Sequence, residues 1–127
     1  MIDIDRFSQI VNAQAEKLPE MVFFRLNLGI GVMEHAKLDR HSQAARPLYV
    51  LGEYRVHQTM GRGILIYYGS FRRAYPHLHD ETELAAEVQR VLNHELTHHL
   101  ESLAGAKDLE IADARSLIDY MAEDQAP

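Results

Sequence analysis

Cysteine is absent from this 127-residue sequence. Without cysteine the chain can form no disulfide bond and can offer no thiolate to a metal ion, so any bound metal must be held by His, Asp or Glu side chains. The same composition fits a reducing compartment, because proteins that depend on disulfides belong mainly to oxidising ones. We therefore expect a cytoplasmic protein.

Long apolar segments are also absent. No run approaches the roughly 20 apolar residues of a transmembrane helix. The N-terminal stretch MIDIDRFSQIVNAQAEK has two aspartates before its first arginine and lacks the apolar centre of a secretory signal. The formal net charge is −6, which disfavours general binding to nucleic acid. These absences predict a protein with no membrane and no nucleic-acid partner.

The residues that are present follow the pattern of a small α+β protein. The 46% hydrophobic and 25% charged residues are ordinary for a globular protein, and the length fits a single domain over residues 1–127. Apolar residues at helical spacing predict an N-terminal helix over residues 3–18, which Pro19 ends. Asp80 as N-cap and Gly105 as stop indicate a second helix, and a last helix follows it.

The segment between these helices predicts a small mixed sheet. A run of β-forming residues indicates a strand that begins near Met21 and bends at Gly29 and Gly31. The polar stretch over residues 35–47 predicts a flexible loop. Two short strands are expected within residues 48–71, and the continuous apolar run of the second is typical of a strand covered on both faces. The whole chain is then one α+β unit.

Three histidines and one glutamate lie within six consecutive positions of the second predicted helix: His94, Glu95, His98 and His99. Because His94 and His98 are four residues apart, their imidazoles project from one face and can bind the same ion. Glu95 lies about 100° around the helix from His94, beside the ion but outside its ligand set. A carboxylate there can take a proton from a water that zinc makes acidic and pass it to a leaving amine. The spacing predicts a zinc site with Glu95 as catalytic base; the alternative is a solvated helix edge with ordinary polar residues.

The other histidines are predicted to lie outside this site. His99 falls near the middle of the apolar arc of the helix, away from the direction that His94 and His98 share, so we expect a buried side chain with one hydrogen bond. His77 and His79 are expected to be loop residues ahead of the helix. The remaining three stand alone in the sequence: His35, His41 and His57.

Several segments resemble the small bacterial zincin-like metallopeptidase family, which has a minimal zincin fold. EKLPEM is similar to the end of the family's leading helix, LGEYR to its Leu-Gly-x-Tyr segment, and GRGILIYYGSFRR to its apolar strand followed by a basic residue. VLNHELTHHL resembles the family's His-Glu-x-x-His-His helix, which is the most specific of these likenesses. The resemblance covers most of the chain and implies a neutral zinc peptidase whose substrate is unassigned.

The sequence departs from this family after the second ligand histidine. In shorter members a glycine ends the helix three residues later and opens a Gly-x-x-Asp turn, whereas here Glu101 occupies that place and Gly-x-x-Asp spans residues 105–108. The resemblance implies Asp108 as third metal ligand, because the glycine turn can bring it back toward the ion. An N-cap of the last helix is an equally good interpretation of Asp108. Glu101, Glu110 and Asp113 are the other candidates.

Two functions are compatible with these residues. The first is a zinc-dependent metallopeptidase of weak or narrow specificity, whose peptide or protein substrate would add in extended form to the strand at residues 64–68. Tyr67, Tyr68 or Tyr75 could supply an oxyanion donor there. The second is a non-catalytic, zinc-stabilised protein-binding module in which a fourth protein ligand closes the site. Glu95 argues against the second function, because a structural zinc site needs no base.

Overall fold

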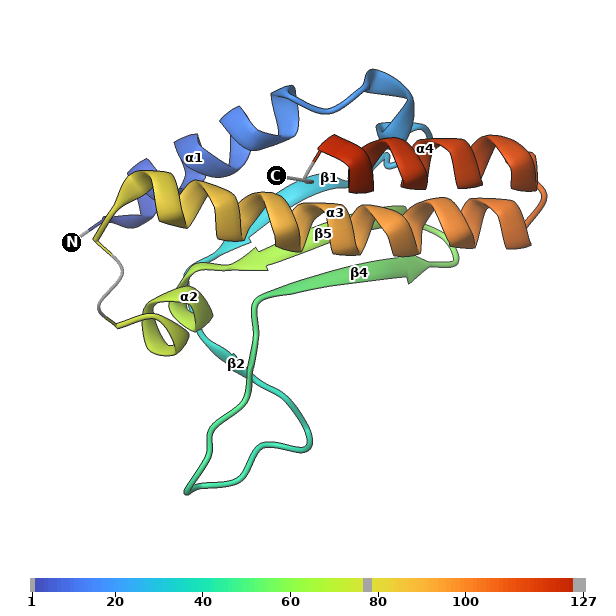
Figure 1. Ribbon diagram of the computed structural model, residues 1–127. Helices are drawn as coiled ribbons and strands as arrows, with labels where there is room; N and C mark the ends of the chain where they lie inside the picture. The colour runs from blue at the N-terminus through green and yellow to red at the C-terminus, as the bar shows by residue number, and fades with distance from the viewer. Residues whose placement is uncertain (1, 77–78, 125–127) are drawn as a thin grey trace.

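Four α-helices, one 3-10 helix and five strands form the described part of the chain, which comprises residues 2–76 and 79–124 of a computed structural model (Figure 1). In chain order the elements are α1 (Ile4–Glu16), η1 (Glu20–Phe23), β1 (Gly29–Met33), β2 (Lys37–Leu38), β3 (Tyr49–Val50), β4 (Gly52–His57), β5 (Gly61–Tyr67), α2 (Tyr68–Ala74), α3 (Glu81–Gly105) and α4 (Ile111–Asp124). Helix α3 lies on the sheet formed by β1, β5 and β4, and α1 and α4 pack against α3 (Figure 1). The α+β class predicted from the sequence is confirmed.

The three-stranded sheet has the order β1-β5-β4, so β5 is its central strand. β1 runs parallel to β5, with Ile30 opposite Ile64, and β4 runs antiparallel to β5, with Tyr54 opposite the same isoleucine. Ile64, Ile66 and Tyr67 are at most 1% exposed, whereas Leu65 is half-buried. The strand is therefore covered fully on the face of Ile64 and Ile66 and only in part on the other face. The second edge of β4 pairs with no other strand among the described residues.

Helices α1 and α3 begin where the sequence predicts, because an aspartate caps each of them. The Asp3 side chain accepts a hydrogen bond of 2.8 Å from the backbone N–H of Arg6, and the Asp80 side chain accepts from two backbone N–H groups in the first turn of α3. Such caps satisfy donors that have no partner within the helix. α3 then buries an apolar face, on which Leu92 and Leu103 are fully enclosed. Across the described ranges, no helix has both the length and the apolar character needed to cross a membrane.

The prediction of a strand that begins near Met21 is wrong. This segment is the 3-10 helix η1, and β1 begins only at Gly29. Val22 is fully buried in the core, and Arg25 has a left-handed backbone with φ of 60°. Core packing followed by a turn thus overrides the β-forming composition of the run, as tertiary context often does.

The second predicted strand ends earlier than expected, at Tyr67, and the chain continues directly as α2. Tyr68 is buried as its apolar neighbours suggest, but against the ring of Phe7, at 5.1 Å between centroids, and not within the sheet. A continuous apolar run therefore does not distinguish a buried strand from the buried start of a helix.

Residues 36–50, here called the arm, begin and end beside α2 and extend away from the three-stranded sheet and from α3 (Figure 1). Within the arm, β2 pairs with β3 through two residue pairs. The base of the arm is fixed by Lys37, whose backbone N–H donates to Ser70 Oγ at 2.9 Å and whose side chain binds the Glu53 carboxylate at 2.6 Å. The polar stretch predicted as a loop therefore includes a short strand and a fixed base.

Candidate metal centre

His94 and His98 lie one turn apart on the exposed side of α3. Their Nε2 atoms are 3.2 Å apart, and their ring planes meet at 89°. Two nitrogens that bind one zinc ion tetrahedrally, each at roughly 2.0–2.1 Å, lie about 3.3 Å from each other. The observed separation therefore fits a shared zinc ion held by nitrogen, the kind of donor that a chain without cysteine can offer.

Glu95 is the buried member of the motif, at 8% exposed. Burial raises the pKa of its carboxyl above the usual range, while the charges of His94 and His98 act in the opposite direction. α3 can approach β4 closely because residue 52 is glycine: a Cβ there would lie 2.5 Å from Val91 Cγ1 and 3.4 Å from Glu95 Cγ. Gly52, the glycine of LGEYR, thus permits the contact between the strand and the glutamate.

An open groove of about 760 Å³ lies beside these residues, between α3, β4 and the arm. Its lining combines the two histidines and Glu95 with residues of the other two elements and of the following turn of α3: Asp39, Val50, Gly52, Glu53, Tyr54, Glu101 and Ser102. Imidazole and carboxylate groups are the nitrogen and oxygen ligands that zinc accepts. The groove therefore has a lining suited to a divalent cation.

Glu53 is already engaged by three donors. Its carboxylate accepts from Lys37 Nζ at 2.6 Å, from Arg55 Nε at 2.6 Å and from the Tyr67 hydroxyl at 3.0 Å. Burial acts to raise the pKa of Glu53, but the three hydrogen bonds outweigh burial, and the pKa lies below its usual value. Glu53 is thus a charged link between the arm, β4 and β5.

His99 is completely buried, as predicted from its place on the helix. Its Nε2 lies 2.7 Å from the Phe24 carbonyl oxygen and its Nδ1 lies 2.8 Å from the Tyr54 hydroxyl. A carbonyl can only accept, so Nε2 carries the proton and Nδ1 accepts from the hydroxyl. Burial lowers the pKa of His99. The side chain has two hydrogen-bond partners, whereas the sequence predicted one. Its bond to Tyr54 holds a residue that lines the groove.

Asp108 lies at the end of this network. Arg62 Nη1 donates to the Tyr54 oxygen at 3.0 Å and to Ser102 Oγ, and Arg62 Nη2 lies 3.8 Å from Asp108 Oδ2. α4 begins at Ile111, so Asp108 is not its N-cap. Asp108 is also not among the residues that line the groove. Its role as third ligand stays a prediction, and its contact with Arg62 weighs against that role.

The remaining candidates for third ligand lie on or beyond the end of α3. Glu101 Oε1 is 3.8 Å from His98 Nδ1, the ring nitrogen that does not face His94. A carboxylate at that nitrogen can orient the ring but does not meet the ion. Glu110 and Asp113 are exposed and lie at the start of α4.

The three tyrosines considered as oxyanion donors all donate elsewhere. The Tyr67 hydroxyl donates to Glu53, the Tyr68 hydroxyl to the Ile2 carbonyl and the Tyr75 hydroxyl to Glu87. The tyrosine that lines the groove is Tyr54, which the sequence reasoning missed. The signal for it was present in LGEYR, where the strand period of two places Tyr54 on the same face as Gly52.

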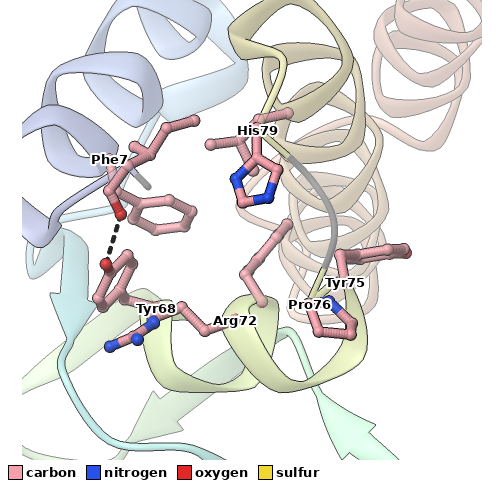
Figure 2. Close-up of a pocket in the computed structure, with 9 residues that line it drawn as sticks. Phe7, Tyr68, Arg72, Tyr75, Pro76 and His79 are labelled. Atoms are coloured by element: carbon pink, nitrogen blue, oxygen red, sulfur yellow. Dashed lines mark hydrogen bonds between the residues drawn. The ribbon is translucent and has the colours of Figure 1, made fainter.

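A second, more enclosed hollow of about 290 Å³ lies between α1, α2 and the start of α3 (Figure 2). Figure 2 shows the rings of Phe7, Tyr68 and Tyr75 around it, with His79 at one side. It shares no lining residue with the groove at His94. His79 is exposed and outside any helix or strand, as predicted for a loop residue, and His77 lies outside the described residues.

The comparison with solved structures finds a conserved hypothetical protein from Thermus thermophilus, with a TM-score of 0.71 and 33% sequence identity. The match covers 82% of this chain and 99% of that chain. This chain belongs to the same family as that protein. The description of that relative assigns no activity. No family model and no curated protein matches the sequence, so the likeness to the zincin-like family stays a prediction.

Proposed function

We propose that this protein is a zinc-dependent metallopeptidase in which His94 and His98 hold the zinc ion and Glu95 is the catalytic base. The observation that supports this proposal is the 3.2 Å separation of the two Nε2 atoms at an open groove, with Glu95 next to them against β4. Zinc held there supplies a Lewis acid, which polarises a carbonyl and lowers the pKa of a water molecule.

Glu95 moves the proton in this proposal. Its carboxylate accepts a proton from the water that attacks the peptide carbonyl, and then donates it to the nitrogen of the leaving amine. Glu95 lies in the middle of a 25-residue helix, and its side chain is held between that helix and β4. A base on a rigid, packed element keeps its place relative to the two histidines, which proton transfer over a short distance requires.

The groove is compatible with an extended peptide or an exposed protein segment. The sequence pointed to residues 64–68 as the docking strand, but that prediction is wrong, because β5 is paired on both sides by β1 and β4. The edge of β4 that faces away from β5 pairs with no other strand among the described residues. The β4 residues Gly52, Glu53 and Tyr54 line the groove. An extended chain can add to such an edge through backbone hydrogen bonds, which need no particular side chains.

Glu95→Gln tests the assigned base, because glutamine is nearly isosteric with glutamate but cannot accept the proton. Glu83→Gln is the matched control, since Glu83 is an exposed residue of the same helix and does not line the groove. Wild type and both variants, at equal zinc occupancy, are incubated with a mixed peptide library and the products read by mass spectrometry. We expect Glu95→Gln to lose about 10² to 10⁴ in rate and Glu83→Gln to match wild type.

Cleavage by Glu95→Gln at the wild-type rate would remove Glu95 from the chemistry. Stoichiometric zinc binding without cleavage by any of the three proteins would instead favour the zinc-stabilised binding module. Zinc with three protein ligands and an open position is typical of a catalytic site, whereas four protein ligands are typical of a structural one. X-ray absorption of the zinc-loaded protein separates these two coordination types.

A further inference from the structure

Two histidines alone leave the proposed zinc site short of a ligand. Catalytic zinc sites use three protein ligands. Within residues 2–76 and 79–124, no third imidazole or carboxylate lies close enough to His94 and His98 to complete a group of three. A third protein ligand from the described residues would therefore have to come from a side chain that lies farther from the two histidines in this structure.

The carboxylates that line the groove are the candidates for this third ligand. Glu53 is engaged by three donors, and Glu101 faces the wrong ring nitrogen of His98. The remaining carboxylate of the lining outside the motif is Asp39, on the arm. Asp39 also lines an adjoining hollow of about 500 Å³ together with His94 and Glu95. Asp39 is thus the carboxylate that faces the same open space as the motif and is carried by a separate segment.

The contacts of Asp39 fix its backbone but leave part of its carboxylate available. Its backbone N–H donates to the Leu48 carbonyl at 2.8 Å, and its Oδ1 accepts from the His41 N–H at 2.8 Å. Oδ2 has no hydrogen bond to any described residue. One oxygen can therefore maintain the turn while the other binds a cation.

The arm has the features of a segment that moves at low energetic cost. Its strand ladder comprises two residue pairs, to which hydrogen bonds within the arm, such as the one from the Asp39 N–H to the Leu48 carbonyl, are added. Its Leu38 and Leu48 side chains are 56% and 52% exposed. Short ladders and few buried apolar contacts characterise the least stable parts of a fold. The contact between Lys37 and Glu53 keeps the base of the arm beside the groove. Because Asp39 lies beyond this base and lines the groove, a movement of the arm about its base changes the distance between Asp39 and α3.

We infer that the arm closes on the bound ion and that Asp39 is its third protein ligand, through Oδ2. This inference rests on the proposed zinc site at His94 and His98, and it does not depend on hydrolysis. Because the arm forms one wall of the groove, ion binding through Asp39 also sets the width of the substrate groove.

Zinc affinity, measured by competition with a chelator, tests the assignment in Asp39→Asn, Asp108→Asn and Glu101→Gln. Asparagine at residue 39 keeps a carbonyl oxygen for the His41 N–H, so the turn is retained. It replaces the proposed ligand oxygen by an uncharged amide NH2 group, which donates hydrogen bonds and does not bind zinc. Loss of a residue that merely orients a ligand costs about 10- to 100-fold in affinity. We expect a loss of more than about 100-fold for Asp39→Asn, of at most about 10- to 100-fold for Glu101→Gln, whose carboxylate lies at the His98 ring, and of less than about 10-fold for Asp108→Asn. The largest loss in Asp108→Asn or Glu101→Gln would overturn the assignment.

Limited proteolysis gives a second readout that needs no activity. Arg40 is exposed and follows Asp39 directly, and trypsin cleavage there yields fragments 1–40 and 41–127. We expect zinc to slow this cleavage at least about 10-fold in wild type and to leave the rate unchanged in Asp39→Asn, because closure protects the arm. Cleavage of wild type that is insensitive to zinc would refute closure. If the double variant His94→Ala/His98→Ala bound zinc as tightly as wild type, the proposed zinc site itself would fail, so the two failures are distinguishable.

Discussion

The sharpest stability prediction concerns His99, because its side chain is completely buried and both ring nitrogens are hydrogen-bonded. His99→Ala removes the bonds to the Phe24 carbonyl and the Tyr54 hydroxyl, each worth about 1 kcal/mol net. It also leaves a void in the core under α3, and large-to-small changes at such sites cost about 2 to 3 kcal/mol or more. The expected loss is therefore about 4 to 5 kcal/mol in the free energy of unfolding, or about 12 to 20 °C in Tm.

Urea unfolding followed by circular dichroism, with a chelator present to exclude metal effects, measures this loss. His99→Gln is the matched variant, because its side-chain amide N–H can still donate to the Phe24 carbonyl, and it should lose about 1 kcal/mol. His41→Ala, at an exposed position of the arm, should stay within about 0.5 kcal/mol of wild type. A loss below about 1 kcal/mol for His99→Ala, with an unchanged m-value, would show that the network around Tyr54 contributes little to the fold.

Two further predictions concern β4. Gly52→Ala would place a Cβ 2.5 Å from Val91 Cγ1 and should cost about 1 to 3 kcal/mol of stability by overpacking. Gly105→Ala, with open space around the residue, should be neutral or slightly stabilising. Equal urea midpoints for the two variants would contradict the close approach of α3 to β4. Because the three hydrogen bonds of Glu53 hold its pKa below the usual 4.5, its contribution to stability is present above about pH 4.5 and lost as the pH falls through the folded-state pKa. Glu53→Gln should therefore reduce the acid sensitivity of unfolding below about pH 4.5, and an unchanged pH profile would refute this role.

Sequence reasoning succeeded for features that depend on local spacing. The caps Asp3 and Asp80 set the starts of α1 and α3 through contacts two or three residues away. A helix likewise fixes residues four apart on one face, so the separation of His94 and His98 follows from their spacing once the helix is known. Local signals failed at Met21, where composition indicated a strand and core packing produced a 3-10 helix.

Features that depend on tertiary contacts were not predictable from one sequence. The Tyr54 hydroxyl meets His99 across 45 positions of the chain, and Arg62 meets Ser102 across 40. Asp39 reaches the groove only because the arm is fixed to β4 at its base. No spacing rule relates residues on a strand, an arm and a helix, because their proximity is set by sheet register and by side-chain packing.

The position of Gly-x-x-Asp gives a physical reason for a ligand from the arm. In the shorter members of the zincin-like family that the sequence resembles, the glycine of the turn lies three residues after the second ligand histidine, whereas here α3 continues to Gly105. Four extra residues move the turn about 6 Å along the helix axis, away from His98 and to the place where Asp108 meets Arg62. In this interpretation the longer helix removes a carboxylate from the ion, and Asp39 on the arm supplies one from the opposite wall of the groove. A chain with the four residues after His99 deleted, so that Gly-x-x-Asp follows the motif directly, should then bind zinc without a contribution from Asp39.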